Sequence, residues 1–199
     1  MRSLLLFILL LIVGCTQVPP LTPKTSSIPE SSSVVVMKSY YDFHWRLKTI
    51  PACGGVIVGK HLIITAAHCV GAVNSEVEYV TRDVWFKTTG GKDVSYVVET
   101  NPTKDIAYLY SPKELGPAAE IRTPQEGEFK LVVKRFKLVR DYANKVGELE
   151  IKLSGGDSGS GVFGEDGKLL GIIHDCNTKE KVIVNDHAKC DVGGDYRLP

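Results

Sequence analysis

The sequence predicts an all-β protein built as a β-sandwich or a β-barrel. Apolar and β-branched residues come in short runs, and segments that contain Gly and Pro separate these runs. Few segments carry apolar residues at the spacing of an amphipathic helix. The 199 residues are 43% hydrophobic and 24% charged, which is ordinary for a soluble globular protein. This length is enough for one large domain or for two small ones that share an interface.

The expected strands form two groups along the chain. The first group comprises residues 54–58, 62–66, 76–86, 94–99 and 106–110. Residues 111–125 follow, with prolines at positions 112, 117 and 124, and are expected to connect two halves of the fold. The second group comprises residues 129–139, 148–153, 161–163, 169–174 and 181–184.

Basic residues are concentrated in the segment 130–140. They alternate with apolar residues, and this pattern favours the solvated face of a pair of strands over a patch for nucleic acid or lipid headgroups. The formal net charge of +1 also indicates no general attraction to nucleic acid. The basic residues are Lys130, Lys134, Arg135, Lys137 and Arg140.

The N-terminus is expected to lie outside the folded domain. The apolar run 4–13 is too short to cross a bilayer comfortably and is typical of a secretory signal. It ends in Ile-Val-Gly-Cys, which resembles the bacterial lipobox, so we expect residues 1–14 to be a lipoprotein-type signal peptide and Cys15 to carry lipid. An ordinary signal peptide or an uncleaved anchor are the alternatives. Residues 15–33, rich in Pro, Ser and Thr, are expected to form a disordered tether.

Three short motifs carry the chemistry of the chain. They are Thr-Ala-Ala-His-Cys at 65–69, Asp-Ile-Ala at 105–107 and Gly-Gly-Asp-Ser-Gly-Ser-Gly at 155–161. A serine hydroxyl is a poor nucleophile unless a base takes its proton and a carboxylate orients that base. With these motifs in the order His, Asp, Ser, residues 51–176 resemble the chymotrypsin/trypsin-like serine endopeptidases.

The resemblance implies a fold of two antiparallel β-barrels with the active site between them. The first barrel would span about residues 34–112 and the second about residues 125–199, within a protease domain of residues 34–199. The three motifs are closer together than in mammalian members, which indicates the trimmed loops of a compact bacterial relative. A cleft between two such halves is a usual place for a site.

The resemblance also assigns catalytic roles. Ser158 would be the nucleophile, His68 the general base and then the general acid, and Asp105 the carboxylate that orients the imidazole. The backbone N–H groups of Gly156 and Ser158 would form the oxyanion hole.

Two other aspartates compete for the role of Asp105. Asp83 and Asp93 also lie between the His and Ser motifs, but neither precedes an apolar strand as Asp105 does. A carboxylate that heads a buried strand needs a partner, and His68 would be one. We therefore prefer Asp105.

Substrate specificity admits two interpretations. In the resembled family, the position six residues before the serine lies at the base of the primary pocket; here it is Lys152, and His174 resembles a pocket-wall residue. Together they would favour cleavage after Glu or Asp. Alternatively, Lys152 lies on the wet face of a half-buried strand, because charged and apolar residues alternate over 148–153, and we favour this interpretation.

The five cysteines are at positions 15, 53, 69, 176 and 190. If Cys15 carries lipid, four remain, and four cysteines allow about three pairings. The resemblance implies a Cys53–Cys69 disulfide around the histidine motif, which leaves Cys176 and Cys190 to pair. Disulfides imply an oxidising compartment, in agreement with export.

One departure from the mammalian pattern concerns activation. No Ile-Val-Gly-Gly start lies upstream of Cys53, so pairing of a newly formed N-terminus with Asp157 is not expected. The protein is either made in its active conformation or needs a partner that orders its oxyanion loop.

The sequence thus predicts an exported serine endopeptidase that acts on a protein or peptide. It would be anchored to a bacterial membrane through Cys15 and would face the periplasm or the cell exterior. No cofactor, nucleic acid or metal is expected, because no Cys/His cluster has zinc-ligand spacing. A non-catalytic binding module on the same fold is the first alternative, and an esterase-like hydrolase is the second.

Overall fold

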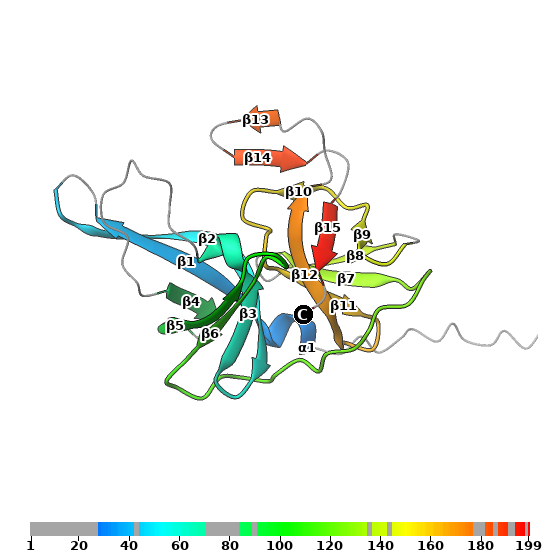
Figure 1. The fold of residues 1–199 in the computed structure, drawn as a ribbon, viewed down its shortest axis with the longest axis horizontal. Coiled ribbons are helices and arrows are strands. Elements are labelled where there is room, and N and C mark those ends of the chain that lie inside the picture. Colours follow the sequence, from blue (N-terminus) through cyan, green and yellow to red (C-terminus); the bar gives the residue numbers. More distant parts are fainter. Residues whose placement is uncertain are drawn as a thin grey trace, which may run out of the picture.

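The structure is a computed structural model in which strands predominate (Figure 1). It describes residues 28–41, 44–70, 84–88, 91–134, 137–142, 145–176, 182–184, 187–190, 194–197 and 199. The expected signal peptide, Cys15 and most of the expected tether lie outside these residues. Within the described part of the chain, no helix combines the length and the apolar character that crossing a bilayer requires.

The first half of the fold is a closed antiparallel barrel. Its strands are β1 (Ser33–Tyr41), β2 (Leu47–Gly59), β3 (Leu62–Ala66), β4 (Val84–Thr88), β5 (Gly91–Asn101) and β6 (Ile106–Tyr110). They follow one another in the order β1-β2-β3-β6-β5-β4, and β4 pairs with β1 to close the barrel. The histidine motif begins in the last two residues of β3, and the aspartate motif leads into β6, which is hydrogen-bonded to β3.

The second half is a six-stranded antiparallel sheet in the order β8-β7-β11-β12-β15-β9, accompanied by a three-stranded sheet in the order β10-β14-β13. Figure 1 shows it beside the barrel, in yellow-green to red. The predicted all-β, two-barrel class is confirmed, and the first half is the one that closes in the described part. The strands are β7 (Lys130–Lys134), β8 (Lys137–Asp141), β9 (Glu148–Leu149), β10 (Leu153–Ser154), β11 (Gly161–Gly164), β12 (Leu169–Cys176), β13 (Val182–Val184), β14 (His187–Cys190) and β15 (Gly194–Arg197).

One hydrophobic core joins the two halves. Ile57 and Ile63 of the barrel belong to the same buried cluster as Leu131, Phe163 and Ile172 of the second half. Burial of each such side chain contributes about 1.5–3 kcal/mol relative to exposure. Since this cluster spans both halves, their relative position is fixed by packing as well as by the chain that connects them.

The connection between the halves is itself bonded to the barrel. Ser111 N–H donates to His61 O at 2.9 Å, and Ala119 N–H donates to Ile57 O at 2.8 Å. Further along, Arg122 N–H donates to Leu169 O of β12 at 3.0 Å. The proline-rich segment therefore runs from one half to the other with its backbone held at both ends.

Residues 28–33 differ from the expected tether. They form the short helix α1 (Ile28–Ser31) and the start of β1, and α1 packs against β7 and β8. Pro29 is buried, and the Ser32 and Ser33 hydroxyls donate to Ile28 O and Pro29 O at 2.7 and 2.5 Å. The composition of this segment did not predict the helix, because Ser hydroxyls can hydrogen-bond to backbone carbonyls in a buried segment as well as in an exposed one.

The basic segment 130–140 also differs in part from expectation. It forms the hairpin of β7 and β8, as a strand pair should. However, Lys130 is fully buried and the Lys134 side chain is only 22% exposed, so these two lysines do not lie on a solvated face.

Gly54 of β2 lies where the barrel and the second half approach each other closely. A Cβ atom at this position would lie 2.7 Å from Ser160 Cα and 2.8 Å from Ser160 N, and backbone atoms cannot yield cheaply. We expect Gly54→Ala to lower the free energy of unfolding by about 1–3 kcal/mol. Gly116→Ala is the control, since the nearest atom there would be Ser31 O at 3.9 Å. Equal denaturation midpoints for the two variants would contradict the close approach.

Candidate active site

Asp105 lies directly before β6, and its backbone is shaped to present the carboxylate. Its φ of 54° is in the left-handed region, which aspartate tolerates better than most residues. The residue is only 8% exposed. Its backbone carbonyl accepts a hydrogen bond from Ala67 N–H at 3.0 Å, and its Oδ1 accepts one from His68 N–H at 2.9 Å. The carboxylate is thus tied to the segment that carries the histidine.

His68 occupies a single 3₁₀ turn, η1 (Ala67–Cys69), that begins where β3 ends. Its Nδ1 lies 2.7 Å from Asp105 Oδ2, and about half of its side chain is exposed. The predicted Cys53–Cys69 disulfide is present and links this turn to β2. The imidazole is therefore held by the carboxylate at its Nδ1 atom, on a turn that the disulfide fixes to β2.

His174, near the end of β12, contacts the same carboxylate. Its Nδ1 lies 2.6 Å from Asp105 Oδ2, so one carboxylate oxygen faces two imidazole nitrogens. The sequence suggested a place for His174 in the pocket wall, and the structure shows in addition that its ring contacts Asp105. Chain order could not reveal this contact, since it depends on how β12 of the second half lies against the barrel.

The contacts of Asp105 determine its acidity. Burial alone would raise the pKa of this carboxyl. The hydrogen bonds from the His68 backbone N–H, the His68 ring and the His174 ring outweigh burial, so its pKa lies below the usual value. Asp105 is therefore ionised at neutral pH and can stabilise a positive charge on a neighbouring imidazole.

Ser158 lies in the serine loop, which we define as residues 154–160. Its carbonyl accepts a hydrogen bond from Gly54 N–H of the barrel at 2.8 Å, and Gly159 N–H donates to Ile173 O at 2.7 Å. Gly159 has a φ of 76°, and a Cβ atom there would lie 2.5 Å from Thr65 Oγ1. Glycine thus allows the loop to press against β3, just before the turn that carries His68.

The serine loop contains the two backbone N–H groups that are expected to form the oxyanion hole. Within the described part of the chain, the N–H groups of Gly156 and Ser158 donate to no acceptor. Gly156 has a φ of 91°, a left-handed conformation that suits glycine. Across the same residues, no hydrogen bond joins the Ser158 hydroxyl to His68.

Comparisons with known proteins bear on the fold that carries these residues. A family model described as Trypsin matches residues 37–130. Two solved structures, an HtrA-type protease AlgW with a decapeptide and the same protease with a tripeptide, superpose with TM-scores of 0.63 and 0.64. The resemblance to the trypsin-like serine proteases is confirmed.

The sequence likeness to those two structures is low. Both are 13% identical to this chain; they cover 86% of it, and it spans 62% and 57% of theirs. They therefore establish the trypsin-like fold alone, and this chain spans about three fifths of their length. A search of curated proteins finds no match.

The structure describes only some of the remaining expected site residues. Lys152 is exposed, and exposure alternates over residues 148–153 as a half-buried strand requires. Asp83 and the side chains of Cys176 and Cys190 lie outside the described residues. Asp93, the other alternative to Asp105, pairs its carboxylate with Lys113 Nζ at 2.7 Å.

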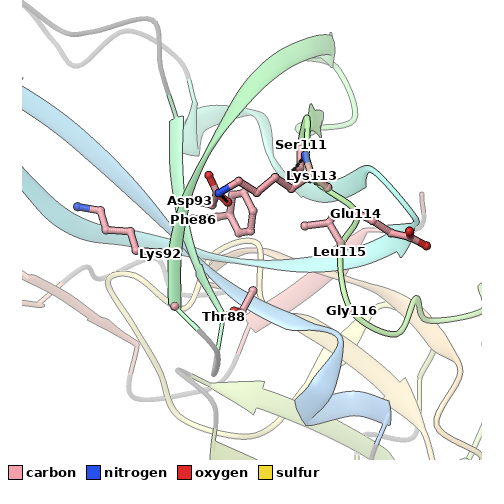
Figure 2. A pocket seen from close by; sticks show the side chains of 10 residues that line it. Phe86, Thr88, Lys92, Asp93, Ser111, Lys113, Glu114, Leu115 and Gly116 are labelled. Carbon is pink, nitrogen blue, oxygen red and sulfur yellow. Dashed lines mark hydrogen bonds and ion pairs between the residues drawn. The ribbon is translucent and has the colours of Figure 1, made fainter.

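The Asp93–Lys113 pair belongs to a surface hollow on the first barrel, between β4, β5 and the start of the connection. Figure 2 shows Lys113 reaching toward Asp93 beside Phe86, with Leu115 on the opposite wall. None of the three catalytic candidates lines this hollow. The candidate active site is therefore defined by the His68–Asp105 contact and not by this depression.

The two imidazoles and Asp105 also form a donor set that zinc accepts, since their ligand atoms lie within 4.8 Å of one another. Their N···O separations of 2.6 and 2.7 Å are those of charge-assisted hydrogen bonds. We therefore assign this cluster as hydrogen-bonded. A second group, of His68 with Cys53 and Cys69, has its two sulfurs already in the disulfide.

The contact of His174 with Asp105 predicts a change in acidity. In His174→Phe the carboxylate loses one of its donors, so the pKa of Asp105 should rise toward the ordinary value. A depressed pKa stabilises the folded state above the unfolded pKa, and this contribution disappears as the pH falls through the folded pKa. In the variant, the ionised Asp105 carboxylate should therefore contribute less to the free energy of unfolding at neutral pH.

Carboxyl NMR titration of Asp105 measures this shift directly. His61→Phe is the control, because His61 Nδ1 contacts Ser111 O at 3.0 Å and not Asp105. An Asp105 titration in His174→Phe that matches the control would show that the contact has no electrostatic effect.

Proposed function

We propose that this chain is a serine endopeptidase that hydrolyses peptide bonds through an acyl-enzyme on Ser158. The observation that carries the proposal is the contact of 2.7 Å between His68 Nδ1 and the ionised Asp105 carboxylate, beside the loop that holds Ser158. An Nδ1–H that donates to Asp105 leaves the Nε2 lone pair of His68 free to accept a proton.

The reaction follows from these roles. Ser158 Oγ attacks the carbonyl carbon of the peptide while His68 Nε2 takes the hydroxyl proton. The negative oxygen of the tetrahedral intermediate accepts hydrogen bonds from the N–H groups of Gly156 and Ser158, and one such donor is worth about 3–4 kcal/mol. His68 then protonates the departing amine, and a water, activated by the same imidazole, hydrolyses the acyl ester.

A protein or peptide is the proposed substrate. The two AlgW structures of the same fold contain a decapeptide and a tripeptide, which supports peptide binding by this fold in general. We further propose that the chain is exported and is anchored to a bacterial membrane through lipid on Cys15. The Cys53–Cys69 disulfide supports export because such bonds persist in oxidising compartments.

A non-catalytic binding module is the second candidate. The observation that favours it is the missing hydrogen bond between the Ser158 hydroxyl and His68 among the described residues. Catalytic hydrogen bonds are often long or poorly aligned without substrate and tighten when it binds. The protease therefore remains the first candidate.

A fluorophosphonate probe tests the proposal. In the full chain we expect labelling at Ser158, located by peptide mass spectrometry, because the probe needs an activated serine and a formed oxyanion hole. Ser158→Ala should abolish the label, and His68→Ala should slow it by about 10³-fold or more. A folded protein with an intact Cys53–Cys69 disulfide that takes no label would instead favour the binding module. A labelled protein that cleaves esters but no peptides would favour an esterase.

A further inference from the structure

Lys38 of β1 lies beside the turn that carries His68. Its Nζ donates to the His68 backbone carbonyl at 3.4 Å. The His68 N–H and ring Nδ1 face Asp105 instead, so the ammonium group and the carboxylate approach the turn at different atoms. Lys38 is paired across the strands with Ile50 of β2, whose side chain is exposed. Side chains paired in this way lie on the same face, so a ligand can reach this part of the hairpin.

The ammonium group of Lys38 can still bind a partner. An ammonium carries three N–H donors, and the contact with His68 O uses one of them. In the described part of the chain, no carboxylate lies within ion-pair distance of Lys38. Two other lysines differ in this respect, since Lys134 Nζ pairs with the buried Asp157 carboxylate at 2.9 Å and Lys113 Nζ pairs with Asp93. Lys38 therefore has no counterion among these residues, although it contacts the proposed general base.

Lys38 is also partly removed from water. Its side chain is half-buried, and burial lowers the pKa of the Lys38 ammonium below its usual value. A neighbouring carboxylate has the opposite effect on such a group. Because folding has already removed part of the hydration of the lysine, an acidic side chain that binds here is attracted without the full desolvation cost.

The course of the reaction indicates which part of a peptide would lie near Lys38. His68 gives its proton to the departing amine, so the segment that follows the scissile bond begins at the imidazole. The carbonyl of the scissile bond lies instead at the N–H groups of Gly156 and Ser158. Lys38 contacts His68 itself. Its ammonium group is therefore expected to lie nearest to the first residues of the departing segment.

We propose that Lys38 selects peptides with Asp or Glu at the first or second position after the scissile bond. This inference rests on the proposed function, because it concerns the peptide that Ser158 would cleave. A carboxylate at such a position would accept charge-assisted hydrogen bonds from the remaining donors of the ammonium group. A basic side chain there would be repelled, so the selection has an attractive and a repulsive part.

The alternative is that Lys38 only ties β1 to the histidine turn. A tie of this kind would affect all substrates equally, since it acts through the position of His68. A charge that contacts the substrate changes the ratio between acidic and basic substrates instead. This ratio is measured within one protein sample, so it does not depend on how much of the sample is folded.

The test exposes the full chain to a synthetic peptide library in which every side chain occurs at every position, and mass spectrometry locates the cuts. At the first or second position after the cut, we expect Asp and Glu to exceed Lys and Arg by about tenfold. Lys38→Met should reduce this preference to about twofold or less, and Lys38→Glu should reverse it. The matched control is Lys60→Met, which removes an exposed lysine paired with Glu114 and should keep the unmodified preference.

Salt provides a second measurement, which needs no variant and covers a failure of Lys38→Met to fold. Lys38 is only half-buried, so added salt screens its attraction for a substrate carboxylate. In the unmodified protein, the preference for acidic side chains after the cut should therefore decrease as NaCl is raised to about 1 M. A preference that salt leaves unchanged would contradict the electrostatic origin and overturn the inference.

The outcomes separate the two proposals. Cuts without an acidic preference, or with the same preference in Lys38→Met, would overturn the role of Lys38 and leave the serine endopeptidase intact. Equal slowing of all substrates in Lys38→Met would identify a structural tie and would overturn that role as well. Fluorophosphonate labelling at Ser158 without cleavage of any peptide would favour the esterase and overturn both proposals. Absence of both cuts and labelling in the unmodified protein would also overturn both.

Discussion

The buried carboxylate of Asp105 is the point on which both halves of this protein depend. His68 reaches it from the barrel, and His174 reaches it from the second sheet. A carboxylate without such donors would cost several kcal/mol to bury. Because its donors come from both halves, the charge is stable only when the halves are docked, and the docking in turn fixes the orientation of His68.

Close backbone approach makes this docking possible. Gly54 and Gly159 stand where the barrel and the serine loop touch, and a methyl group at either position would meet main-chain or buried polar atoms. The two glycines therefore set the distance between the halves, and the charged groups set their register. Small residues and buried carboxylates act together, since neither a close contact nor an ion pair alone would place Ser158 beside the histidine turn.

The sequence predicted the local features well and the long-range contacts poorly. Turn residues and apolar runs located β3 and β6 at their observed bounds, and the motif frames located His68, Asp105 and the Cys53–Cys69 disulfide. The contact of His174 with Asp105 was missed, as was that of Lys134 with Asp157. Each joins a side chain on a strand to a carboxylate in a turn or loop elsewhere in the chain. The alternation of charged and apolar residues on a strand says nothing about which carboxylate faces it.

The two carboxylates differ in what their partners can do. Asp157 pairs with an ammonium group, a fixed charge that suits a structural task. Asp105 instead faces two imidazoles, and its Oδ2 lies within hydrogen-bond distance of the Nδ1 atom of each ring. Because His174 draws on the same oxygen, it weakens the attraction that Asp105 exerts on a protonated His68, while it fixes the carboxylate in place. Removal of His174 would therefore strengthen the attraction between Asp105 and a protonated His68, but it would leave the carboxylate with fewer contacts to hold its orientation.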